Sequence, residues 1–420
     1  MNKKSPQSAF FSLILLSMLL FHLLPVIAGS ALSWNIQTVD ESAHTYQSRC
    51  PIALDSKGLP HIAYNDLRVE PNRRQTGLVM YANWNGTNWK TQQIAKGITL
   101  SLVLDDNDQP HILYKGSLEP LMYASWTGSE WDIQIVDPNF TSYGSGVVAL
   151  DSQGNPHVAY TDGITVKYAV LNGEEWTVQT VAQYEDVEIP PKLSFVLDKN
   201  DTPYIMHSPS SYVYFPQDVG IQAINVTLAT YQNSSWKIQP LSLPPPTGEY
   251  GSLVVDSKGG LHSIFTKHHY VSSESKTVLS TILYASWNGT GWDMQTVVSD
   301  IRLPYSMSLA LDSRDYPHII CSSNEPVYAS WTGTAWDMQA TDVSGYLAVD
   351  ADGNLHVSYL AGSPMVVTSL MYATATPPTP TPTPYSEPQS TEQEIIIGVA
   401  LVLAVIALGL GLLLYLIKRK

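Results

Sequence analysis

Six histidines stand at one equivalent place in a repeated stretch of the chain, shortly after an aspartate and a turn. They are His61, His111, His157, His262, His318 and His356. A ring of imidazoles could bind a metal ion if the side chains faced a common axis. Repetition in nearly every unit favours a structural role instead, because a binding site usually breaks symmetry. We therefore expect each histidine to hydrogen-bond to the turn beside it, and we predict no metal site.

Two acidic stretches contain the ligand types that calcium prefers. Asp105 to Asp108 and Asp350 to Asn354 resemble fragments of oxygen-rich calcium loops. Neither carries the distal bidentate glutamate of an EF-hand. Turn chemistry accounts for most of these side chains, and calcium binding is the alternative.

Five tyrosines lie shortly before apolar strands, in segments of unequal length, and carboxylates accompany them. The tyrosines are Tyr46, Tyr143, Tyr184, Tyr250 and Tyr305, and the carboxylates are Glu41, Glu185, Asp186, Glu188 and Glu249. Aromatic faces beside carboxylates suit a sugar or the basic groups of a partner protein. Ordinary packing of loop tyrosines is the alternative. If the chain were a hydrolase or lyase, its acids would come from Glu185, Asp186, Glu188 or Glu249, but no basic clamp accompanies them, and we assign no catalytic residue.

Tryptophans occur in pairs that could form sugar platforms between structural units. The pairs are Trp84/Trp89, Trp126/Trp131, Trp287/Trp292 and Trp331/Trp336. Packing inside the fold is the alternative interpretation, and we favour it because the pairs recur with the repeat.

These residues belong to a repeat that occurs seven times, beginning with ALDSKGLPHIAY at residues 53 to 64. Each copy has an apolar run, an aspartate, a Gly or Asp three residues later, and then a second apolar run that usually opens with Pro-His. This chemistry predicts a hairpin, because the fourth turn position needs the left-handed conformation that Gly and Asp tolerate best. The aspartates that open the copies are Asp55, Asp105, Asp151, Asp198, Asp256, Asp312 and Asp350.

A second repeated stretch, exemplified by YASWTGSEW at residues 123 to 131, adds another hairpin to each unit. Each unit therefore offers four short strands, which we name A to D in chain order. Four antiparallel strands without helical periodicity are typical of one propeller blade. The A strands are almost wholly apolar, so we place them innermost.

The two ends of the repeat region complement each other. The segment from Trp34 to Asp40 matches a D strand without A, B or C before it, and the seventh unit lacks a D strand after its C strand at residues 367 to 373. We expect the first strand to complete the last blade and close an all-β ring of seven blades, since closure removes exposed sheet edges. A linear solenoid is the alternative. The long B–C and D–A loops would then share one face of the disc, where we expect binding.

The segments outside the repeats predict export and anchoring. Residues 1 to 28 combine Lys3 and Lys4 with a long apolar run, which is typical of a signal peptide, or else of an uncleaved anchor. The propeller spans residues 29 to 373, and residues 374 to 394 form a Thr/Pro-rich stalk. Residues 395 to 417 carry no charge and are long enough for a transmembrane helix. A basic tail, residues 418 to 420, would stay in the cytoplasm, which leaves the propeller outside a single-pass membrane anchor.

Composition narrows the possible partners. The net charge of −15 predicts that the surface repels nucleic acid and anionic polymers. Cys50 and Cys321 fall in different blades, so we expect free thiols rather than a disulfide. Nothing suggests a cofactor. Six sequons are glycosylation candidates in an exported chain: Asn85, Asn139, Asn200, Asn225, Asn233 and Asn288.

The D-x-x-G-x-P-H and Y-A-x-W-x-G-x-x-W repeats resemble propeller repeats of bacterial and archaeal surface proteins. They are also similar in style to Asp-box repeats of the sialidase type and to propeller lectins with W-x-G-x-x-W turns. The Thr-Pro stalk with its C-terminal span resembles that of archaeal surface proteins. A sialidase would require three clamping arginines from different blades, whereas the arginines before the tail fall in few units, and the S-x-D-x-G-x-x-W order does not occur.

The sequence thus predicts a membrane-anchored propeller that binds a glycan or another surface protein. An exported polysaccharide-acting hydrolase or lyase and a structural envelope protein are the alternatives. The resemblance is specific for the fold and leaves the ligand open.

Overall fold

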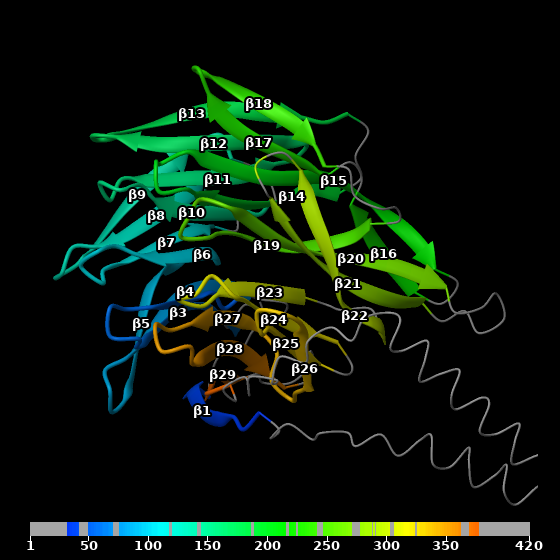
Figure 1. Ribbon diagram of the computed structural model, residues 1–420. Helices are drawn as coiled ribbons and strands as arrows, with labels where there is room; N and C mark the ends of the chain where they lie inside the picture. The colour runs from blue at the N-terminus through cyan, green and yellow to red at the C-terminus, as the bar shows by residue number, and fades with distance from the viewer. Residues whose placement is uncertain are drawn as a thin grey trace, which may run out of the picture. The chain divides into compact units, whose positions relative to one another are not determined.

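The structure is a computed structural model. It describes residues 32–41, 49–69, 75–116, 120–140, 144–185, 189–215, 218–223, 226–241, 247–270, 278–287, 289, 291–302, 306–323, 326–362 and 369–377. Within these ranges the protein is all-β and forms seven antiparallel sheets of four or five strands (Figure 1). The predicted signal peptide, stalk, transmembrane span and basic tail lie outside the described residues.

Each sheet is one blade, and six blades follow the chain in order. Blade 1 holds β2 (Ile52–Leu54), β3 (Pro60–Val69), β4 (Gln75–Trp84) and β5 (Trp89–Lys96); blade 2 holds β6 (Ile98–Leu104), β7 (Pro110–Lys115), β8 (Leu121–Trp126) and β9 (Trp131–Asp137). Blade 3 holds β10 (Gly146–Leu150), β11 (Pro156–Asp162), β12 (Thr165–Asn172) and β13 (Glu175–Gln183); blade 4 holds β14 (Ile189–Leu197), β15 (Pro203–Phe215), β17 (Thr227–Gln232) and β18 (Ser235–Pro240). Blade 5 holds β19 (Thr247–Val255), β20 (Leu261–Tyr270), β21 (Val278–Trp287) and β22 (Trp292–Arg302); blade 6 holds β23 (Ser306–Leu311), β24 (Pro317–Ser322), β25 (Val327–Trp331) and β26 (Trp336–Ala340).

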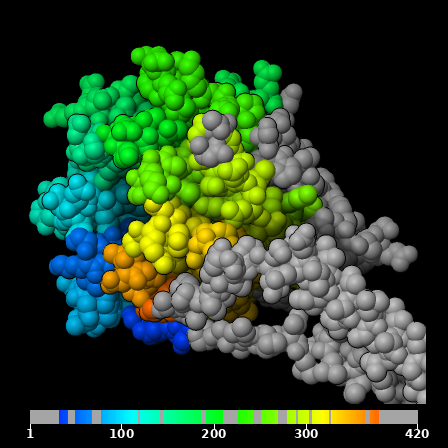
Figure 2. Space-filling view, viewed as in Figure 1, coloured from blue at the N-terminus to red at the C-terminus, as the bar shows by residue number. Residues whose placement is uncertain are grey.

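Blade 7 is assembled from both ends of the propeller. Its strands are β27 (Tyr346–Val349), β28 (Leu355–Ala361), β29 (Ser369–Ala375) and β1 (Asn35–Asp40), in that order across the sheet. Asn35 of β1 pairs with Thr374 of β29, and the antiparallel register continues to Asp40 and Leu370. Figure 2 shows the first residues of the propeller, in blue, beside the last ones, in orange. The predicted closure into seven blades is confirmed.

The A strands are innermost, as their apolar sequences predicted. Each contacts the A strand of the neighbouring blade, and in Figure 1 the labels β6, β10, β14, β19, β23 and β27 surround the centre. Seven apolar clusters fill the spaces between the sheets, and each joins side chains of two neighbouring blades. The cluster at the closure seam packs Val39 and Leu370 of blade 7 against Ile62 and Tyr64 of blade 1. Burying these side chains contributes about 1.5–3 kcal/mol each relative to leaving them exposed.

The repeated A–B turns adopt the predicted backbone. The fourth position has a positive φ in all seven: 75° at Gly58 and 61° at Asp108, for example. The amide of this residue donates to the carbonyl of the leading aspartate, as Gly58 does to Asp55 at 2.9 Å. The leading carboxylate also accepts two backbone amides, from Lys57 and Leu59 at 2.9 and 2.7 Å in the first copy. One aspartate therefore fixes each turn.

One part of the predicted B–C loop of blade 4 is a strand rather than a loop. The strand β16 (Asp218–Ala223) pairs with the far half of β15, so that β15 contacts β17 with one half and β16 with the other. In blade 5 the B and C strands are long, and their pairing continues from His262 and Ser286 to Tyr270 and Val278. Among the described residues, no helix is long and apolar enough to cross a membrane.

Candidate functional site

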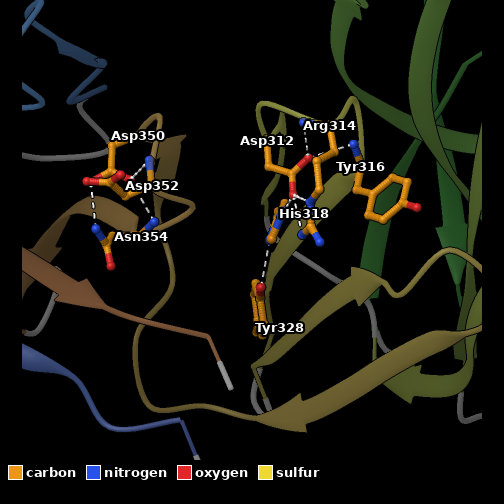
Figure 3. Close-up of polar contacts among 8 residues, drawn as sticks. All are labelled: Asp312, Arg314, Tyr316, His318, Tyr328, Asp350, Asp352 and Asn354. Atoms are coloured by element: carbon orange, nitrogen blue, oxygen red, sulfur yellow. Dashed lines mark hydrogen bonds and ion pairs between the residues drawn. The ribbon is translucent and has the colours of Figure 1, made fainter. Parts of the chain in front are cut away.

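Each repeated histidine connects an aspartate of its own turn to a tyrosine of the C strand. In blade 1 the hydroxyl of Tyr81 lies 2.5 Å from Nδ1 of His61, and Nε2 of His61 lies 3.9 Å from Asp55. In blade 7 the distances are 2.6 Å from Tyr372 to His356 and 3.2 Å from His356 to Asp350. The same trio occurs in six blades, with tyrosines Tyr81, Tyr123, Tyr168, Tyr284, Tyr328 and Tyr372. Figure 3 shows the trio of blade 6, with His318 between Asp312 and Tyr328.

Burial determines the protonation of these trios. Burial lowers the pKa of His61, His111, His157, His318 and His356. Burial likewise raises the pKa of the tyrosine, to about 12 at Tyr372. The neutral imidazole therefore accepts a hydrogen bond from the tyrosine hydroxyl at Nδ1, and its Nε2–H points toward the aspartate. Nε2 bonds to the aspartate in blades 3, 5 and 7, whereas Nε2 of His318 in blade 6 is buried without a hydrogen bond. Among the described residues, no group of side chains could hold a metal ion.

Blade 4 has other residues at the histidine and tyrosine positions of the trio. Tyr204 stands at the histidine position, and burial together with the Asp198 carboxylate raises the pKa of Tyr204. Leu228 stands where the other blades have the tyrosine, and it packs in an apolar cluster with Trp292 of blade 5. Since a Tyr–Leu pair substitutes for His–Tyr in blade 4, the trio can be replaced by packing alone. The histidines bond to a C-strand tyrosine and approach the aspartate side chain, rather than bonding to the turn backbone as expected.

The tryptophan at the start of each D strand packs against the preceding blade. Trp176 of blade 3 meets the ring of Tyr123 of blade 2 edge-on at 5.4 Å, and its Nε1–H donates to Gln134 at 3.1 Å. Glutamine follows this tryptophan by three residues in all seven blades, and this W-x-x-Q pattern is the sequence signal for the contact. The members of a tryptophan pair lie on neighbouring strands of one blade, as Trp126 and Trp131 of blade 2 do at 5.4 Å, and the second member also packs against the preceding blade.

Serine–aspartate clamps tie three pairs of neighbouring turns together. The backbone amide and hydroxyl of Ser56 both donate to Asp108, each at 2.7 Å. Equivalent pairs are Ser152 with Asp201 and Ser257 with Asp315. An aspartate occupies the left-handed position in blades 2, 4 and 6 because its carboxylate receives these bonds. Two stretches resemble calcium loops in sequence, Asp105 to Asp108 and Asp350 to Asn354. In both, the leading carboxylate already accepts hydrogen bonds from backbone amides of its own turn.

A cavity of about 570 Å³ opens at the A–B turn end of the central channel. Its apolar wall comes from the inner strands and includes Val103 and Phe195. Its rim carries Asp106 and Asn107 from one turn and Gln153 from the next, and all three are exposed. These rim side chains form no hydrogen bond with another described side chain, whereas Asp105 and Asp151 are engaged by their turns. Only blades 2 to 5 line the cavity, so it breaks the seven-fold repetition.

Of the five predicted tyrosines, the structure describes the side chain of Tyr184. Its hydroxyl lies 2.6 Å from Nδ1 of His207, an imidazole whose pKa burial lowers to about 4. Tyr46, Tyr143 and Tyr305 lie outside the described residues, and Tyr250 is described only in its backbone, so their predicted ligand role stays a prediction. Glu41 and Glu185 are exposed, Asp186 and Glu188 lie outside the described residues, and the side chain of Glu249 is not described.

The remaining sequence candidates are on the surface or in the core. Asn85, Asn139, Asn200 and Asn233 are exposed, and Asn225 and Asn288 lie outside the described residues. Cys50 and Cys321 are buried free thiols, as predicted, and burial raises the pKa of each to about 12. Neither thiol is therefore a nucleophile in the folded protein.

No protein-family model matches the chain, and no curated protein sequence matches it. Among solved structures, the chain is similar to the polysaccharide lyase Uly1, with 10% identity, a TM-score of 0.53, and coverage of 83% of this chain and 99% of the lyase. It is also similar to a copper-bound fungal alcohol oxidase of the AA5 family, with 11% identity, a TM-score of 0.50, and coverage of 83% and 77%. The six-bladed fucose lectin of Aleuria aurantia matches at 13% identity with a TM-score of 0.45, over 71% of this chain and 96% of the lectin. At such identities the similarity establishes the fold alone, and the function has to be argued from the residues of this chain.

Proposed function

We propose that the protein is a membrane-anchored surface module whose propeller lies outside the cytoplasm and binds a glycan. The observation that carries the proposal is the cavity at the A–B turn end, because it is the concave feature that departs from the repeat. Ligand sites are typically 300–1,000 Å³ in volume, with apolar walls and a few convergent polar groups. The cavity of about 570 Å³, with its valine and phenylalanine wall and polar rim, falls within that description.

The chemistry of the rim favours a neutral sugar. Asp106 offers acceptors, while the amides of Asn107 and Gln153 offer both donors and acceptors, which suits hydroxyl groups. The carboxylates at this end and the net charge of −15 disfavour a long anionic polymer. A surface protein that presents hydroxyl or basic groups is the alternative occupant.

The anchoring half of the proposal rests on sequence. Residues 395 to 417 carry no charge and are followed by Lys418, Arg419 and Lys420. A span of this length with a basic flank orients its C-terminus toward the cytoplasm. Protease digestion of intact cells tests the orientation: propeller fragments are expected to be released, with the basic tail protected.

Glycan-array binding by the full chain in detergent tests the proposal. We expect binding to neutral glycans, with at least tenfold weaker binding for Asp106→Ala and Gln153→Ala. Asp352→Ala is the control, since Asp352 is an exposed turn carboxylate of blade 7 at the position that Gln153 holds in blade 3, and it does not line the cavity. Tyr143→Ala and Tyr250→Ala test, in the same experiment, the long-loop face on which the sequence predicts binding.

Three results would redirect the proposal. Loss of binding only in the tyrosine variants would move the site to the long-loop end. Binding to no glycan would leave a protein partner or a structural role. Release of unsaturated or reducing sugar ends from a bound polysaccharide would favour the hydrolase or lyase alternative.

A further inference from the structure

Two of the seven blade seams leave the tryptophan of the D strand without a hydrogen bond. Nε1 of Trp131, in the seam between blades 1 and 2, is buried and has no partner among the described residues. Nε1 of Trp292, in the seam between blades 4 and 5, is buried and equally without a partner. In the other five seams the indole N–H donates to a side-chain oxygen of the preceding blade, as Trp89 does to Gln37 at 3.0 Å.

A substitution on the preceding D strand distinguishes these two seams. Where the seam is paired, the residue two positions before the glutamine is Asn, Asp or Thr. Asp132, for instance, accepts a hydrogen bond from Nε2 of Gln134 at 2.8 Å. This bond turns Oε1 of the same glutamine toward Trp176. Lysine cannot accept this bond. Lysine occupies the position only in the two unpaired seams, as Lys90 and Lys237.

The glutamines of the unpaired seams remain in place but do not reach the indole. The side chains of Gln92 and Gln239 are exposed and form no hydrogen bond with a described residue, and the neighbouring Lys90 and Lys237 are exposed as well. Lys90 and Gln92 share one face of β5, because alternate residues of a strand point the same way. In the paired seams this is the face that turns toward the next blade.

The surface beside Trp131 in the first unpaired seam is apolar. Ile133 and Ile135 follow Trp131 on the same face of β9, and they are 41% and 51% exposed. In the second unpaired seam Met294 follows Trp292 and is half-buried. Each unpaired seam thus combines an ammonium group, a glutamine amide and an unsatisfied indole N–H with an apolar surface.

We propose that these two unpaired seams are binding sites for acidic saccharides. The acidic oxygen of the ligand takes the place that glutamine Oε1 holds beside the indole in four of the five paired seams. The lysine neutralises its charge, and the glutamine amide donates a second hydrogen bond to it. The apolar surface accepts the C–H face of the sugar ring. A carboxylate and a sulfate ester offer the same acceptor chemistry.

The charge of the protein limits the ligand to a short acidic unit. A net charge of −15 opposes a long polyanion, whereas one acidic residue at the end of a neutral glycan meets mainly the local lysine. The proposal therefore adds a second class of sugar and a second location to the neutral-glycan site proposed for the cavity.

Fluorine NMR of the full chain in detergent, labelled with 5-fluorotryptophan, tests the proposal. The signals are assigned with Trp131→Phe and Trp292→Phe. The ligands are sodium glucuronate, galactose 6-sulfate and, as the neutral reference, glucose. We expect glucuronate or the sulfate to shift these two signals saturably while the paired tryptophans stay unchanged, and glucose to have no effect. The more effective acid identifies the source of the charge.

Substitution of the lysines supplies the decisive control. Lys90→Asp restores the pattern of the paired seams, so we expect it to weaken binding in the first unpaired seam at least tenfold and to raise the melting temperature. Lys237→Asp should do the same in the second unpaired seam. Lys96→Asp removes the same charge from an exposed position of the same strand and should leave binding intact.

Several outcomes would overturn the inference without touching the cavity proposal. The first is that neither acid shifts the fluorine signals of Trp131 and Trp292. The second is that Lys90→Asp and Lys96→Asp change binding equally. The third is that glucose shifts the signals as much as glucuronate does. Because Asp106→Ala affects the cavity alone, neutral-glycan binding that depends on Asp106 would survive each of these results.

Discussion

Removing one tyrosine hydroxyl tests whether the repeated Asp–His–Tyr trio stabilises the propeller. Tyr81→Phe in blade 1 deletes the donor that lies 2.5 Å from Nδ1 of His61 and keeps the ring that packs against Trp131 at 5.6 Å. Tyr81 and His61 are each 7% exposed, so water cannot readily replace the lost bond. Nε2 of His61 is 3.9 Å from Asp55, too far for a hydrogen bond to compensate.

The expected cost follows from that geometry. Leaving a buried acceptor unsatisfied costs about 1–3 kcal/mol. The unfolding entropy of about 2.1 cal/mol/K per residue gives about 0.7 kcal/mol/K for a propeller of about 345 residues. A loss of about 2 kcal/mol should therefore lower the melting temperature by about 3 °C.

Urea denaturation and calorimetry of the full chain measure this cost. The matched control is Tyr231→Phe, since Tyr231 is half-buried against Trp236 and its hydroxyl bonds to no described residue. We expect the control to be neutral within about 0.5 kcal/mol, as for most surface changes. If Tyr81→Phe proved as neutral as the control, the Asp–His–Tyr trio would not be a stabilising element of the propeller.

Three further predictions concern pH, the seams and the thiols. Burial holds the folded-state pKa of the core histidines below the unfolded value, at about 4 for His207, so protonation favours the unfolded chain. In urea titrations the free energy of unfolding should therefore be constant above about pH 6.5 and should fall toward pH 4. A flat profile would contradict neutral, buried histidines. Asp132→Lys should copy an unpaired seam and leave Trp176 without its acceptor, costing about 1–3 kcal/mol by urea denaturation, whereas an unchanged midpoint would show that the aspartate does not orient the glutamine. Cys50 and Cys321 should react with a thiol reagent at the rate of global unfolding, and rapid labelling at pH 8 would contradict their burial.

The fold could be predicted from the sequence because its signals are local and repeated. An aspartate followed at the fourth position by Gly or Asp specifies each turn, and the positive φ values of Gly58 and Asp108 bear this out. The lone strand beginning near Trp34 and the missing D strand of the last unit implied closure, which the pairing of Asn35 with Thr374 confirms. The extra strand β16 was missed because it has no counterpart in the other units, so the four-strand repeat did not indicate it.

The candidate sites were harder to predict, since they depend on contacts between blades. The cavity arises from how four inner strands converge, which residue spacing alone does not reveal. The unpaired seams do have a sequence signal. Glutamine recurs three residues after each D-strand tryptophan, and the residue directly after that tryptophan is neutral or acidic except at Lys90 and Lys237. Recognising that signal requires knowing that the tryptophan of one blade faces the glutamine of another.

The sharing of blade 7 between β1 and β29 imposes an order on biosynthesis. The strand Asn35–Asp40 is among the first parts of the propeller to be synthesised, yet its partner Ser369–Ala375 is the last. Until then its backbone groups have no sheet to join, and contacts so distant in sequence form slowly. A nascent chain therefore carries an unpaired strand through almost the whole of translation, and any truncation before residue 369 should yield an open, aggregation-prone product rather than a smaller propeller.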